Sequence, residues 1–264
     1  MCICTLKIHV QREVFVSISP EVPHEAIQPE PSNPHIERQF RLRRSSVNAI
    51  KKLSNVLWGV LSFFALIIGI FSLRYALPHI PHPAPLPNFR VNHRGLIVHA
   101  VSASLALLLG PWQFLPGLRQ RHPYLHRFIG RAYALSLLVA AISAIWIAPH
   151  AAAGHVSAAG FLSLAVGWLF TTSMGIAAIR RRDIATHRRW MIRSYALTAA
   201  AITLRIYLSS IPLFHLSFQI AYPVISWLCW IPNLLAAEVW IHWTDAAPYE
   251  RPIGQHGPVV PNVS

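Results

Sequence analysis

The chain has 264 residues, of which 54% are hydrophobic and only 12% are charged, and its mean hydropathy is +0.42. A soluble domain carries about 25% charged residues, so this composition argues against an ordinary soluble enzyme. The 23 Lys and Arg residues outnumber the 9 Asp and Glu residues, which gives a formal charge of +14. The basic residues lie between long apolar segments, a pattern that is typical of a membrane protein.

The polar N-terminal segment, residues 1–50, is predicted to be a basic, disordered cytoplasmic tail. It lacks the basic start, apolar stretch and small-residue cleavage site of a signal peptide. The three cysteines, Cys2, Cys4 and Cys229, exclude a disulfide framework. No Cys/His spacing resembles a structural zinc site.

Six apolar segments are long enough to cross a hydrocarbon core of about 30 Å, which needs about 20 helical residues. In chain order they are 55–77, 95–115, 130–148, 156–179, 190–214 and 217–241. They lack the alternation of period two that β-barrel strands show. We therefore predict an all-α, polytopic membrane helix bundle with six transmembrane helices. The transmembrane domain covers residues 51–243, and residues 244–264 form a short cytoplasmic tail.

Lys and Arg gather before the first span, after the second and after the fourth. These residues are Arg38, Arg41, Arg43, Arg44, Lys51, Lys52, Arg119, Arg121, Arg127, Arg180, Arg181, Arg182, Arg188 and Arg189. The positive-inside bias then places both termini in the cytoplasm of a multi-pass protein of the cell inner (plasma) membrane. Anionic headgroups of the lipid bilayer are the expected partners of these loops, at about 1 kcal/mol per basic residue. Binding to the lipid surface therefore accounts for the charge of +14, which does not have to indicate nucleic-acid binding.

Prolines mark two interruptions. Residues 78–87, rich in Pro and His, are predicted to end the first helix and form an extended outer loop. Pro223 and Pro232 are predicted to kink the sixth span.

Four histidines at the ends of the spans form two levels. His99 and His155 lie near the outer face on spans two and four, and His126 and His187 lie near the inner face at spans three and five. Helices two apart in an antiparallel bundle can face each other, and a six-coordinate haem iron takes an imidazole from each side. We therefore expect haem b as a cofactor, with His99–His155 and His126–His187 as axial pairs of two haems stacked across the bilayer.

Arginines within the spans are the other candidates. Arg131 and Arg205 are expected to neutralise haem propionates or to hold an anionic substrate. Because a charge near the midplane is costly, Arg205 should contact an anion, a carbonyl or several backbone oxygens. Arg193 and Glu238 lie at matching depth and are predicted to form a structural ion pair.

Helical spacing supports these candidates in part. His187 and Arg205 are five turns apart and share a face with Ser194, Thr198 and Ala201, a polar stripe on an apolar helix.

Two alternatives stay open. Histidine tolerates the membrane interface without binding a cofactor. The face that carries His99, Ser102, Ala106 and Gly110 is small enough for a macrocycle but equally suits a close helix contact.

Four segments carry a resemblance to a known family: HRGLIVH (93–99), GPWQF (110–114), HRFIGRAY (126–133) and DIATHRRWMIRSYALTAAAITLR (183–205). They resemble the bacterial predicted membrane proteins grouped as domain of unknown function 2306, over a family-like core of about 90–215. That family implies no settled activity. The paired histidines are similar in layout to two-haem transmembrane cytochrome b proteins, although His126 and His187 lie at the inner boundary rather than inside a span.

The sequence thus predicts an integral membrane protein that binds haem b as an electron carrier or quinone-linked oxidoreductase, with a quinone or a redox protein as partner. One alternative is a cofactor-free transporter or small-molecule-binding protein with a midplane site at Arg205. Another is a non-catalytic membrane scaffold.

Overall fold

A computed structural model describes residues 34–74, 77 and 92–246, and every regular element within them is helical. Six helical segments are long and apolar enough to cross a membrane. They are Lys52–Leu73, His93–Phe114, Pro123–His150, His155–Arg180, Ile184–Leu213 and Phe218–Asp245. The predicted all-α fold and the six spans are therefore confirmed. The predictions for residues 1–33, 78–87 and 247–264 concern segments outside the described residues.

The first helix, α1 (Pro34–Leu73), begins well before the membrane span that it contains. Residues 34–50, which were predicted to be part of a disordered tail, are helical in the structure. The physical reason is that neither proline nor glycine occurs between Pro34 and Gly59, and Pro34 suits the first position of a helix. The helix that the apolar segment nucleates therefore extends through the polar residues before it.

The remaining elements begin and end close to the predicted spans. They are α2 (His93–Leu109), η3 (Pro111–Phe114), α3 (Pro116–Arg121), α4 (Pro123–Ile147), η4 (Ala148–His150), α5 (His155–Arg180), α6 (Ile184–Thr198), α7 (Ala200–Leu213), α8 (Phe218–Leu228) and α9 (Ile231–Ala246). Pro111, Pro116 and Pro123 each stand first in their helix, where the missing N–H is not needed. The sixth span divides into α8 and α9 before Pro232, because a proline ring clashes with the carbonyl four residues earlier.

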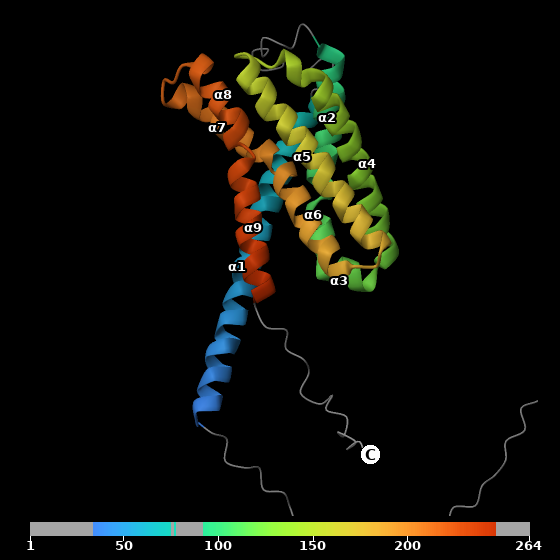
Figure 1. The fold of residues 1–264 in the computed structure, drawn as a ribbon, viewed down its shortest axis with the longest axis vertical. Coiled ribbons are helices and arrows are strands. Elements are labelled where there is room, and N and C mark those ends of the chain that lie inside the picture. The colour runs from blue at the N-terminus through green and yellow to red at the C-terminus, as the bar shows by residue number, and fades with distance from the viewer. Residues whose placement is uncertain (1–33, 75–76, 78–91, 247–264) are drawn as a thin grey trace, which may run out of the picture. The chain divides into compact units, whose positions relative to one another are not determined.

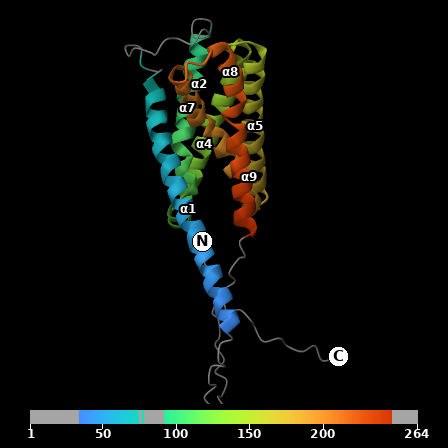
Figure 2. The same ribbon diagram turned by 90° about the vertical axis from the view of Figure 1, so that its left-hand side faces the viewer.

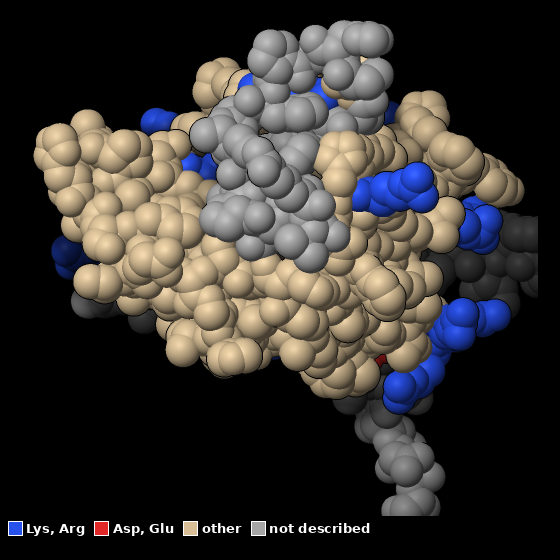
Figure 3. Space-filling view, turned by 90° about the horizontal axis from the view of Figure 1, so that it is seen from above, with Lys and Arg blue, Asp and Glu red and all other residues tan. Residues whose placement is uncertain are grey.

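The described residues from Val47 onward belong to one compact unit. Helix α2 packs mainly against α4, α5 against α4 and α6, α8 against α5, and α9 against α6 (Figures 1 and 2). We call the end that carries α3 and the α5–α6 turn the basic end, because Arg119, Arg121 and Arg180 lie there. The end that carries η4 and the α7–α8 turn is the opposite end. Uncharged residues make up most of the described surface seen at the opposite end (Figure 3).

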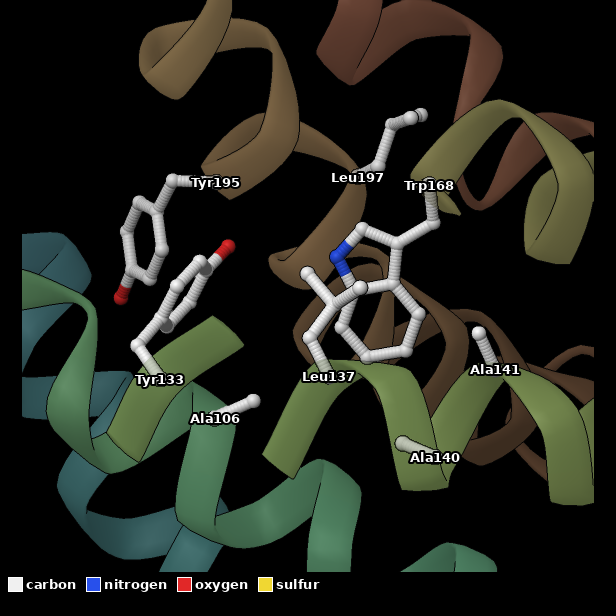
Figure 4. Packing of buried hydrophobic residues seen from close by; sticks show 8 residues of the cluster. All are labelled: Ala106, Tyr133, Leu137, Ala140, Ala141, Trp168, Tyr195 and Leu197. Carbon is white, nitrogen blue, oxygen red and sulfur yellow. The ribbon is translucent and has the colours of Figure 1, made fainter. Parts of the chain in front are cut away.

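The core of the bundle is made of small and aromatic side chains from α2, α4, α5 and α6. Its buried members are Ala106, Tyr133, Leu137, Ala140, Ala141, Trp168, Tyr195 and Leu197 (Figure 4). Lipid tails are as apolar as these residues, so close packing and hydrogen bonds hold the helices together. Gly160 shows this closeness, since a Cβ atom there would clash with Ser226 of α8. The missing side chain at Gly160 therefore lets α5 and α8 pack closely.

Candidate functional site

A cavity of about 300 Å³ lies between the helices in the half of the bundle toward the opposite end. Its wall comes from α2, α5 and α7, with single contributions such as Ser72 of α1 and Tyr222 of α8. Small-molecule sites typically measure about 300–1,000 Å³ and combine an apolar wall with a few polar groups. The polar groups here include His99, Thr198 and Arg205. The cavity is therefore the candidate functional site.

His99 is held in a defined orientation. Its Nδ1 lies 2.9 Å from the carbonyl oxygen of Ala140 on α4. A carbonyl can only accept, so Nδ1 carries the proton and donates it. The other ring nitrogen, Nε2, is then left with a lone pair. A ring that is anchored in this way and lines a cavity can bind a metal or accept a proton from a ligand.

Arg205 lies in the same cavity wall, on α7. Its Nη1 donates to the carbonyl of Ala201 at 2.9 Å, and its Nη2 donates to the hydroxyl of Ser72 at 2.6 Å. The prediction that Arg205 contacts a backbone carbonyl is confirmed. These bonds hold the guanidinium beside the cavity, within electrostatic range of His99.

The two histidines predicted to pair at this level occupy different positions. His99 lines the cavity, whereas His155 is exposed as the first residue of α5. The turn before it contains Gly154, with a φ of 91° that favours glycine. His150 in η4 lies in the cavity wall and is itself exposed. It therefore marks the mouth of the cavity.

Two further histidines are predicted to pair near the basic end. His126 on α4 lies within electrostatic range of His187 on α6 and of Arg119 on α3. The Nδ1 of His187 donates to the carbonyl of Gly175 at 2.8 Å, which repeats the arrangement of His99. The Nδ1 of His126 is buried and has no hydrogen-bond partner among the described residues.

Gln113 adds a second polar group to this region. A Cβ atom at Gly130, one turn after His126 on α4, would lie 3.1 Å from the Oε1 of Gln113. The absence of a side chain at Gly130 therefore leaves room for the Gln113 amide. Its Nε2 is also buried and has no partner in the part of the chain that the structure describes.

The polar stripe predicted on span five crosses a break in the helix. Helix α6 ends at Thr198 and α7 begins at Ala200. Thr198, Ala201 and Arg205 nevertheless line the same cavity. Ser194 and Thr198 also contact the Tyr133 hydroxyl.

A buried hydrogen-bond network surrounds Tyr133. The Tyr133 hydroxyl lies 2.8 Å from both Ser194 Oγ and Thr198 Oγ1. Thr172 Oγ1 lies 2.7 Å from Ser194 Oγ, and the indole N–H of Trp168 donates to Thr198 at 3.0 Å. The sequence placed Ser194 and Thr198 on one helix face but did not predict that Tyr133 joins them. Trp168 and Thr172 carried no signal beyond their position in the middle of an apolar span.

Two further predictions concern charged residues. Arg193 donates through Nε and Nη2 to the two carboxylate oxygens of Glu238, at 2.6 and 2.7 Å, so the predicted ion pair is confirmed. Arg131 is exposed on α4.

The small-residue face of α2 is a helix contact at Gly110, because a Cβ atom there would clash with the ring of Tyr195. This observation favours the second of the two alternatives for that face.

Among the described residues no group of three or more His, Cys, Asp and Glu side chains comes together as a metal site.

Comparison with known proteins identifies the family. The family model described as Predicted membrane protein (DUF2306) matches residues 96–241. The match includes His99, His126, His155, His187 and Arg205, and it covers more than half of the chain. No curated protein and no solved structure matches the chain. The weaker similarity to two-haem cytochrome b proteins is not confirmed. The chain is a member of the DUF2306 family of predicted membrane proteins.

Proposed function

We propose that this protein is a membrane electron carrier that binds haem b in the cavity, with His99 as an axial ligand. The observation that carries the proposal is the position of the His99 ring. It lines the cavity, and its Nδ1–H is fixed on the Ala140 carbonyl at 2.9 Å. Histidines that bind metals almost always donate their other ring N–H to a carbonyl, a carboxylate or water, which fixes the tautomer and the ring orientation.

The rest of the cavity wall suits the same group. Apolar side chains such as Leu107, Leu164 and Leu204 make up most of it, as the flat face of a macrocycle requires. Arg205 supplies a cation for a propionate. Haem, when bound, would supply one-electron chemistry. The residues of the chain bind it, neutralise its carboxylates and exclude water.

For the second axial ligand of the haem in the cavity, the sequence favours His155, because of its span and its depth in the membrane. Besides His99, His150 also lines the cavity, five residues before His155 in the chain. Separate replacement of His150 and His155 decides between them, because the axial ligand is the one whose loss changes the spectrum of the iron.

A second haem between His126 and His187 belongs to the same proposal. It is supported by the electrostatic range in which His126 and His187 lie and by the bond of 2.8 Å that fixes His187 Nδ1 on the Gly175 carbonyl. Arg131 is proposed to add positive charge near this site. A quinone or a redox protein is the proposed electron partner, and the basic end is proposed to face the cytoplasm of the inner membrane, against anionic headgroups.

Absorption spectra of the oxidised and dithionite-reduced protein, with a pyridine haemochrome assay, test the proposal. The expected result is a sharp reduced spectrum that His99→Ala weakens. His242→Ala is the matched control, because His242 is exposed on α9 and its Nδ1 bonds the Glu238 carbonyl of its own helix at 2.8 Å. A protein that stays colourless after expression with ample haem would overturn the proposal.

A second candidate function is cofactor-free binding of a small molecule that carries a carbonyl or a carboxylate group. The observation that favours it is the joint placement of the His99 ring and the Arg205 guanidinium in one cavity wall. A short-chain quinone should then raise the thermal midpoint of a colourless preparation. Arg205→Gln should abolish that rise.

A further inference from the structure

A chain of buried hydroxyl groups connects the middle of the bundle to the cavity. Its members, in order, are Thr172 of α5, Ser194 of α6, Tyr133 of α4 and Thr198 of α6, joined by contacts of 2.7, 2.8 and 2.8 Å. None of these four side chains is more than 5% exposed. Thr198 also lines the cavity, so the chain ends at the candidate site.

The hydrogen bonds along this chain of hydroxyl groups can all point in either of two directions. Each hydroxyl donates one hydrogen bond and can accept two. In one arrangement Thr172 donates to Ser194, Ser194 to Tyr133 and Tyr133 to Thr198, which donates to the Ser194 carbonyl at 3.0 Å. In the reverse arrangement Thr198 donates to Tyr133, Tyr133 to Ser194 and Ser194 to Thr172, which donates to the Trp168 carbonyl at 2.9 Å. Every hydroxyl is satisfied in both, so the direction can reverse without an unpaired group.

Two buried polar atoms lie between this chain of hydroxyl groups and the basic end, and they need hydrogen-bond partners. His126 lies two turns before Tyr133 on α4, and His187 lies two turns before Ser194 on α6. The Nδ1 of His126 and the Nε2 of Gln113 are buried without partners among the described residues. Buried polar atoms of this kind are commonly satisfied by ordered water.

We propose that these groups form a proton-transfer path, so that the protein conducts protons between its basic end and the cavity. His126 lies two helical turns, about 10 Å, before Tyr133 on α4, so a row of water molecules carries the proton from the region of His126 and Gln113 to Ser194 Oγ. The proton of Ser194 passes to Tyr133 Oη, that of Tyr133 to Thr198 Oγ1, and that of Thr198 to water in the cavity. One proton enters and one leaves, one O–H bond forms for each that breaks, and no electron is transferred.

This activity goes beyond electron transfer and does not require haem. The indole N–H of Trp168 can only donate, so Trp168 anchors Thr198 at 3.0 Å and does not itself relay a proton. Rotation of the hydroxyl groups returns the chain to its first arrangement. Tyr133 is the necessary link, because it bridges Ser194 and Thr198.

Proton flux into liposomes tests the path. The full-length protein is reconstituted with an internal pH dye, and a valinomycin-clamped potassium gradient drives protons. The wild type should acidify the lumen at least tenfold faster than Tyr133→Phe, after subtraction of the rate of protein-free liposomes. Tyr195→Phe is the matched control, because that buried hydroxyl contacts only the Leu107 carbonyl, at 3.5 Å, among the bonds of the described residues.

Thr198 supplies a second test that does not depend on the folding of Tyr133→Phe. Thr198→Ser keeps the hydroxyl and should conduct, whereas Thr198→Val should not. A wild-type rate equal to that of protein-free liposomes, or equal rates for these two variants, would overturn the path. A haem assay on the same liposomes keeps the two proposals separate, because conduction by a colourless protein leaves the path standing and removes the haem.

Discussion

The guanidinium of Arg193 and the carboxylate of Glu238 meet through two parallel bonds between α6 and α9. Their side chains are 19% and 34% exposed, so the pair is neither fully buried nor free in solvent. In a membrane the charges would otherwise stand in a medium that solvates them poorly. Arg193 also lies over the ring of Trp190, with its Cζ 4.6 Å from the ring centroid. The pair therefore fixes α9 on α6.

Glu238→Gln should lower the stability of the purified protein by about 1–3 kcal/mol. This range lies between the 3–5 kcal/mol that breaking a buried pair costs and the 0–1 kcal/mol of a surface pair. Thermal unfolding of the single variants and of Glu238→Gln with Arg193→Gln completes a double-mutant cycle. The control is Asp245→Asn, which breaks the pair between Arg189 and Asp245, whose side chains are 45% and 42% exposed. Equal losses for the two acidic variants would contradict the prediction.

Asp183 stands at the start of α6, outside the spans, and its carboxylate accepts from the Thr186 N–H at 2.9 Å. This bond, with the charge of Arg189, holds the pKa of Asp183 below its ordinary value. A lowered pKa means that the carboxylate stabilises the fold above the ordinary value of about 3.9, and that the stabilisation is lost as the pH falls through the folded pKa. Asp183→Asn should keep the cap and lose this pH dependence, whereas Asp183→Ala should lose both. Thermal midpoints between about pH 2 and 6 test it; parallel profiles for wild type and Asp183→Asn would contradict it.

At the scale of the element, the length of the apolar segments was enough to predict the spans. The predicted segment 156–179 and the helix His155–Arg180 nearly coincide. Pro232 predicted the break in the sixth span, because a proline disrupts the helix at its own position in the sequence. The break after Thr198 had no such signal, since the alanines around it are good helix formers. Which helices touch depends on side-chain shapes from distant segments and could not be predicted.

The effect of glycine replacements in α5 on the free energy of unfolding should distinguish tight from loose helix contacts. Gly160→Ala should cost about 1–3 kcal/mol, because its Cβ would clash with Ser226 and overpacking carries such a cost. Gly167→Ala on the same helix would place its Cβ 3.7 Å from Leu197, an ordinary contact, and should be neutral or stabilising. Unfolding in mixed micelles measures both, and a Gly160→Ala variant as stable as the wild type would refute the prediction.

At the scale of the whole molecule, the positive-inside bias predicts which end of the bundle faces the cytoplasm. Ser217→Cys lies at the opposite end and Gly117→Cys at the basic end, and both positions are exposed. In a background without native cysteines, an impermeant maleimide should label Ser217→Cys in intact cells. It should label Gly117→Cys only after lysis. The inverse result would place the basic end outside.

Part of the candidate site could be predicted from the sequence, and little of its geometry. Depth along the spans selected His99 and Arg205, which share a cavity wall, and His126 and His187, which lie within electrostatic range of each other. Depth alone could not show that His155 is exposed, because the rotation of α5 about its axis depends on packing. The hydroxyl network was beyond the sequence for a similar reason. Its bonds join three helices, and each hydroxyl could instead have bonded its own backbone.

Helix α1 is the span with the least protein around it. Only 17% of its apolar window is buried, against 39% for the span that begins at His93. Acyl chains therefore surround most of its length, and the match between helix length and bilayer thickness governs its tilt. Ser72 near its end accepts the 2.6 Å bond from Arg205. We therefore expect extraction into detergent to disturb the cavity at Ser72, the α1 residue of its wall.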